Sequence, residues 1–114
     1  MKYPIAIEVD DETHAYGVVV PDLPGCYSAG DTLDLAYENA KEAIAGWIEV
    51  ELDDGHEIPL PSKLEDIEKQ GDFKGWILGI VEVPDDFLSE KTHRISMTND
   101  DQFDAAHKLL RALA

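Results

Sequence analysis

The sequence predicts an α+β fold with three antiparallel strands, a long crossover helix, a short helix and a fourth strand. Three observations predict it. Residues 2–29 hold short β-rich runs separated by turn residues, residues 32–53 repeat apolar side chains at helical spacing, and residues 73–83 form a mostly apolar run. At 114 residues the chain suits one domain with a short appendage.

The three N-terminal strands are predicted from their turns as much as from their side chains. Residues 2–9 alternate apolar and polar side chains, which predicts a half-buried strand. Pro4 indicates either that the strand begins there or that it lies at the edge of the sheet. Residues 15–20 form the second strand and residues 26–29 the third, which stops at Gly30. The Pro-Asp-Leu-Pro-Gly segment between them, residues 21–25, is predicted to be an ordered loop.

Capping, periodicity and termination agree on a long amphipathic helix over about residues 32–53. Asp31 or Thr32 caps it, Asp34 lies in its first turn and Gly55 ends it. Its predicted buried stripe consists of apolar residues at steps of three and four: Leu33, Ala36, Tyr37, Ala40, Ala43, Ile44, Trp47 and Val50.

A short helix and a last strand complete the predicted domain. Ser62 and Glu65 form a capping-box pair that opens a helix ending at Gly71. Residues 73–83 are apolar on both faces, which indicates a strand covered on both sides or lying centrally in the sheet. A right-handed crossover would set this strand parallel to one of the first three.

The C-terminal tail differs from the rest of the chain, so we divide the chain into an acidic domain, residues 1–90, and a ribbon–helix tail, residues 91–114. Residues 92–98 alternate polar and apolar side chains, and Asn99 caps a last helix. An isolated strand needs a partner, which predicts a homodimer or tetramer. The candidate oligomerisation residues are Ile95, Met97, Phe103, His107 and Leu110.

Charge is unevenly distributed between these two parts. The net charge of −16 excludes binding to nucleic acid by general electrostatic attraction. Residues 1–90 carry five basic and twenty-two acidic residues, whereas residues 91–114 carry a net charge of +1. Such an acidic domain either docks on a basic, nucleic-acid-binding partner or simply maintains solubility.

The sequence predicts a cytoplasmic protein without a membrane partner. A single cysteine, Cys26, cannot form an internal disulfide, which is typical of a reducing compartment. The first residues turn acidic after position 8, unlike a signal peptide, and no apolar run is long enough to cross a bilayer.

No cofactor or metal is predicted, because the histidines are far apart and Gly75 and Gly79 lie within a strand pattern. One alternative is a metal-dependent nuclease that uses carboxylates near strand ends: Asp10, Glu12, Asp22 and Asp31. Another is a DNA-binding regulator, in which two paired ribbons direct outward side chains into the major groove. Its candidate DNA contacts are Arg94, Ser96 and Thr98.

Residues 16–44 resemble the HicB family of antitoxins. The shared pattern is a strand, a Pro-Asp-Leu-Pro-Gly-Cys turn, a short strand, Gly-Asp-Thr at 30–32 opening a helix, and Asn-Ala-Lys-Glu-Ala-Ile at 39–44. Residues 58–62 and 91–98 also resemble family segments, so the resemblance extends over most of residues 1–98.

The resemblance implies a partial RNase H-like fold without catalytic carboxylates, followed by the ribbon strand and helix. It further implies an antitoxin, not an enzyme, that neutralises a small basic HicA-type toxin, an mRNA-cleaving protein. Family members often carry a C-terminal DNA-binding domain that represses their own operon. Sixteen residues follow Thr98, enough for one helix and not the two of a ribbon-helix-helix domain. The resemblance assigns no toxin-contacting residues.

Overall fold

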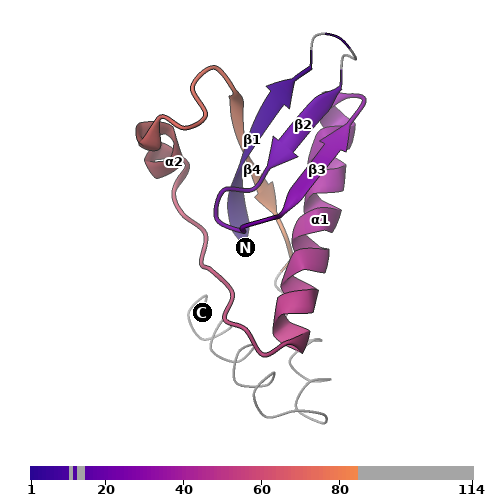
Figure 1. Cartoon of the computed structure of the whole chain (residues 1–114), viewed down its shortest axis with the longest axis vertical. Coiled ribbons are helices and arrows are strands. Elements are labelled where there is room, and N and C mark those ends of the chain that lie inside the picture. The colour runs from indigo at the N-terminus through magenta and orange to yellow at the C-terminus, as the bar shows by residue number, and fades with distance from the viewer. Residues whose placement is uncertain (11, 13–14, 85–114) are drawn as a thin grey trace.

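The computed structural model describes residues 1–10, 12 and 15–84. Their elements follow the predicted order: β1 (Lys2–Val9), β2 (Tyr16–Val19), β3 (Tyr27–Gly30), α1 (Leu33–Asp53), α2 (Leu64–Gln70) and β4 (Ile77–Glu82). The α+β fold class is therefore confirmed (Figure 1). In this part of the chain no helix is both long and apolar enough to cross a membrane.

The four strands form one sheet in the order β3-β2-β1-β4, and every neighbouring pair is antiparallel. The last strand runs parallel to one of the first three, as expected, but does not lie beside it. β4 pairs antiparallel with β1 and shares its direction with β2, which is not its neighbour. Figure 1 shows the reason: after α1 ends, the chain runs back through α2 and enters β4 at the same end of the sheet at which α1 begins.

The position of β4 also corrects the prediction of a strand that is central or covered on both sides. β4 is an edge strand, and Ile77 and Ile80 are 40% and 48% exposed. β1 is one of the two inner strands of the sheet, and its Pro4 lies opposite Ile80. Pairing between β1 and β2 begins only at Ala6, so the missing N–H of Pro4 interrupts no bond to β2.

Helix α1 covers one face of the sheet and begins and ends as predicted. The Thr32 hydroxyl accepts the Leu35 N–H at 3.1 Å, and Gly55 takes a φ of 76° after the last turn. The buried stripe is narrower than expected and advances by four residues per step, whereas Leu33 and Val50 are exposed. It consists of Ala36, Ala40, Ile44, Ile48 and Leu52.

Two glycines let the helix and sheet approach closely. A Cβ on Gly30 would meet the backbone of Ala36, and a Cβ on Gly79 would meet the side chain of Tyr37. The first contact involves backbone at the start of α1, so it has little freedom to yield. The packing of α1 on β3 thus depends on Gly30, whereas the contact at Gly79 is with the end of the Tyr37 side chain, which can move.

The predicted capping box of α2 is wrong. The N-cap is Lys63, with no side-chain hydrogen bond, although Gly71 ends the helix as expected in a left-handed conformation. Ser62 is unavailable for capping because its N–H and hydroxyl both donate to Asp22. A tertiary contact has therefore replaced the local one.

Candidate partner-binding surface

The sequence-predicted DNA-contacting and oligomerisation residues all fall in the tail, residues 91–114, outside the described residues. The structure thus leaves Arg94, Ser96 and Thr98 as predictions, together with Ile95, Met97, Phe103, His107 and Leu110. The candidate surface must be sought on the acidic domain.

The carboxylates of the nuclease alternative do not meet at one point. Asp10, Glu12 and Asp31 follow strands that end, or turn, at one end of the sheet, whereas Asp22 follows β2 at the other end. The Asp10 carboxylate accepts the Glu12 N–H at 3.0 Å, as expected for a turn. Over residues 1–10, 12 and 15–84, no three His, Cys, Asp or Glu residues are placed to hold a metal ion.

Asp22 instead joins two loops at the end of the sheet. Its carboxylate accepts the Ser62 N–H at 2.7 Å and the Ser62 hydroxyl at 2.6 Å. Nearby, the buried Tyr3 hydroxyl donates to the Pro59 carbonyl at 2.6 Å. Burial, and secondarily the negative charge of Asp22, raise the pKa of Tyr3 well above its usual value. These contacts assign Asp22 a structural role.

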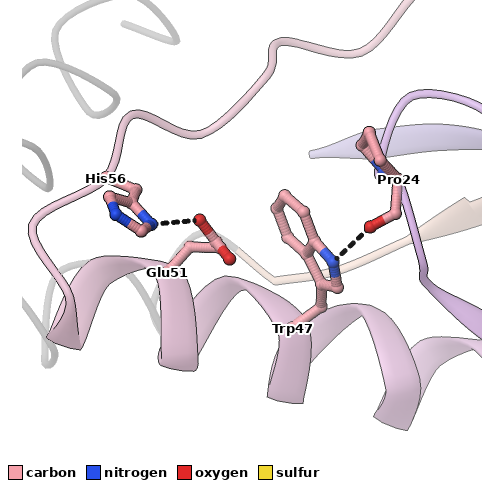
Figure 2. Close-up of polar contacts among 4 residues, drawn as sticks. All are labelled: Pro24, Trp47, Glu51 and His56. Carbon is pink, nitrogen blue, oxygen red and sulfur yellow. Dashed lines mark hydrogen bonds and ion pairs between the residues drawn. The ribbon is translucent and has the colours of Figure 1, made fainter.

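The loop of residues 21–25 is ordered by its own hydrogen bonds and by α1. The Leu23 N–H donates to the Val20 carbonyl and the Cys26 N–H to the Leu23 carbonyl, while the Leu23 side chain is fully buried. Figure 2 shows the Trp47 indole N–H donating to the Pro24 carbonyl, at 3.0 Å. Burial also raises the pKa of the Cys26 thiol, as expected for a packing residue rather than a nucleophile.

The outer face of α1 carries a row of carboxylates. Asp34, Glu38 and Glu42 follow one another at four-residue steps, which places them along one side of the helix, and all three are exposed. The end of α1 is acidic too: its last turn contains no basic residue. There Glu51 contacts the exposed ring of His56, with Oε2 and Nδ1 2.8 Å apart (Figure 2).

One end of this row borders a groove between α1 and the edge strand β4. The groove encloses about 490 Å³. It is lined by Asp34, Tyr37, Glu38 and Lys41 of α1 and by Ile80, Val81 and Glu82 of β4. Because Gly79 faces Tyr37 and side chains alternate along a strand, Val81 also faces α1, whereas the side chains of Ile80 and Glu82 lie on the other face of the sheet. No sequence motif predicted this groove. The available signal was the four-residue spacing of the acidic residues, which marks an exposed face without showing that β4 lies beside it.

Comparison with known proteins identifies the family of this chain. Residues 3–107 match the family described as HicB_like antitoxin of bacterial toxin-antitoxin system. The chain is 42% identical to a 14.9 kDa protein from the rep-hol intergenic region of Haemophilus phage HP1, over 94% of this chain and 84% of that protein. The chain belongs to the HicB-like antitoxin family.

Solved structures agree with this membership. The N-terminal domain of the Burkholderia pseudomallei antitoxin HicB is 36% identical and superposes with a TM-score of 0.65, over 74% of this chain and 99% of that chain. A chain of the structure titled HicA3 and HicB3 toxin-antitoxin complex is similar, at 33% identity and a TM-score of 0.62, with 74% of this chain and 99% of that chain covered. The α+β fold of the described residues therefore matches the fold of HicB antitoxin N-terminal domains.

Proposed function

We propose that this antitoxin binds a small basic HicA-type toxin stoichiometrically in the cytoplasm and neutralises it. In this proposal its acidic domain covers the surface with which the toxin binds and cleaves mRNA. The observation that carries the proposal is the row of exposed carboxylates on α1, Asp34, Glu38 and Glu42. A protein that binds RNA presents cations to phosphate groups, and a rigid row of carboxylates competes for the same cations.

Co-expression tests this function. The chain, carrying an affinity tag, is produced together with the open reading frames that flank its gene. We expect a small basic protein to co-purify at one to one and to arrest growth when produced alone. If no flanking product binds, or if the bound product is harmless alone, the proposal is wrong.

Salt dependence tests the electrostatic part of the proposal. Exposed charges are screened over about 10 Å at 0.1 M salt. The association rate of the two purified proteins should therefore fall steeply between 50 and 500 mM NaCl, with a smaller change in the dissociation rate. An association rate that is independent of salt would contradict charge-guided binding.

The antitoxin is proposed to act without catalysis of its own. The contacts of Asp22 with Ser62 support this, because they engage one carboxylate that the nuclease alternative requires. Purified chain incubated with RNA and Mg²⁺ should leave the RNA intact. Cleavage that disappears in Asp22→Asn, with the fold retained, would restore the nuclease alternative.

We also propose that the tail, residues 91–114, joins two or more chains and presents Arg94, Ser96 and Thr98 to operator DNA. The residues proposed to join the chains are Ile95, Met97, Phe103, His107 and Leu110. Light scattering gives the number of chains, and a mobility-shift assay on the promoter fragment measures DNA binding. Arg94→Ala should abolish the shift while leaving the oligomer intact.

A further inference from the structure

The outer edge of β4 offers unpaired backbone groups to another strand. The Met1 amino group donates to the Val83 carbonyl and the Val83 N–H to the Met1 carbonyl, each at 2.7 Å. Because bonded pairs alternate along an antiparallel ladder, the backbone of Leu78, Ile80 and Glu82 points away from β1. In the part of the chain that the structure describes, no strand pairs with this edge.

The groove beside this edge determines what kind of strand would fit. Toward α1, an added strand would place alternate side chains near Asp34 and Glu38, with Lys41 as the one cation in the lining. On the opposite face of the sheet its other side chains would meet Ile80, which is 48% exposed and lies opposite Pro4. A strand with basic residues on one side and apolar residues on the other complements both surfaces.

We propose that an extended basic segment of the toxin adds to β4 as a fifth strand, with its cationic side chains directed at Asp34 and Glu38. This inference rests on the proposed function, since it names where the toxin binds. Main-chain hydrogen bonds to Leu78, Ile80 and Glu82 supply affinity, and the two side-chain surfaces supply specificity. A nucleic acid does not fit this groove, because the carboxylates that line it would repel the phosphate groups of the backbone.

A second copy of this chain fits the edge less well. Two β4 strands paired antiparallel would bring together two grooves that are each lined by Asp34 and Glu38. Like charges placed opposite one another destabilise strand pairs. Charge therefore favours a basic partner over self-pairing.

Two variants separate this docking mode from general electrostatic attraction. Ile80→Pro removes an outward N–H while leaving the β1 ladder intact, because Ile80 and Pro4 form a non-bonded pair. Glu38→Lys reverses a charge inside the groove. The matched control is Glu65→Lys, which makes the same charge reversal at an exposed position on α2 outside the groove lining and outside the carboxylate row.

The probe is the small basic protein recovered by co-expression, titrated against the full-length antitoxin. We expect Ile80→Pro and Glu38→Lys each to weaken binding roughly tenfold or more, and Glu65→Lys to weaken it by about threefold or less. Thermal unfolding of each variant checks that the fold is retained. Equal losses in Glu38→Lys and Glu65→Lys, together with wild-type affinity of Ile80→Pro, would overturn the docking mode.

Amide hydrogen exchange measured by NMR provides a second readout that does not depend on variants. In the free chain the N–H groups of Leu78, Ile80 and Glu82 should exchange rapidly, and in the complex they should become protected. Protection already present in the free chain, with an oligomer that Ile80→Pro dissociates, would assign the edge to a second copy instead. If the wild-type chain captures no toxin, the proposed function fails as well; if it captures toxin that ignores these variants, the docking mode alone fails.

Discussion

The contact between Asp22 and Ser62 predicts a large loss of stability on removing one carboxylate. It joins the loop of residues 21–25 to the extended segment of residues 58–62, with the Asp22 oxygens 2.7 and 2.6 Å from the Ser62 nitrogen and hydroxyl. Both hydrogen bonds are partly buried and span 40 positions of sequence. Asp22→Ala removes both and leaves the Ser62 N–H without its acceptor.

The magnitude follows from the number and kind of these bonds. A hydrogen bond to a charged group contributes about 1.5–3 kcal/mol, and partial exposure places these two near the lower end. Asp22→Ala should therefore lower the free energy of unfolding by about 2–3 kcal/mol, or Tm by about 10–20 °C for a domain of this size. Ser62→Ala, which removes only the hydroxyl bond, should lose about 1–1.5 kcal/mol.

Urea unfolding followed by circular dichroism measures both variants. The matched control is Glu42→Ala, which removes the same charge from an exposed position on α1 and should change the free energy of unfolding by less than about 0.5 kcal/mol. If Asp22→Ala and Glu42→Ala have the same stability, the carboxylate does not hold the two loops together and the structural role assigned to Asp22 is wrong.

Three further predictions concern α1 and the core. Gly46→Ala should stabilise the chain by about 0.5–1 kcal/mol, because Gly46 lies within α1 with open space around it. Gly30→Ala should instead destabilise the chain by at least about 2 kcal/mol, because the added Cβ would meet the backbone of α1. The same urea unfolding assay measures both variants. Trp47→Phe should lose about 0.5–1 kcal/mol, since the bond to Pro24 is exposed, and a larger loss would mean that the indole does more than the structure shows. Because the pKa of Tyr3 is raised in the folded chain, its contribution to stability is complete below about pH 10, where the hydroxyl is neutral in both the folded and the unfolded chain, and is lost as the pH rises further. Tyr3→Phe should remove this loss of stability at alkaline pH. If the stability of Tyr3→Phe depends on pH as that of the wild type does, the prediction is wrong.

Much of the fold was predictable because its elements carry local signals. The cap at Thr32, the helical spacing that follows and the stop at Gly55 all lie within the segment they describe. What failed were statements about neighbours in space. Whether residues 73–83 lie centrally or at an edge depends on the route of the chain after α1, which no local pattern records. Ser62 failed as a cap for the same reason, because Asp22, 40 positions away, competes for it.

The sequence predicted the negative charge of the candidate site but not its position beside β4. The excess of carboxylates in residues 1–90 is plain in the sequence, and their four-residue spacing puts Asp34, Glu38 and Glu42 on one side of a helix. That this side borders an edge strand depends on pairing between residues 2–7 and 77–82, a contact across most of the domain. The functional surface arises from two elements whose separation in sequence conceals their proximity.

Folding alone does not account for where these carboxylates lie. Like charges four residues apart destabilise a helix by about 0.2–0.5 kcal/mol per pair, and α1 contains two such steps between Asp34 and Glu42. The last turn of α1 has acidic residues and no basic one, although the negative end of the helix dipole favours cations. A basic partner reverses the sign of each of these effects, since it neutralises the repulsion along the row. Under the proposed function, binding of the cationic toxin would relieve this repulsion and so contribute to the free energy of binding.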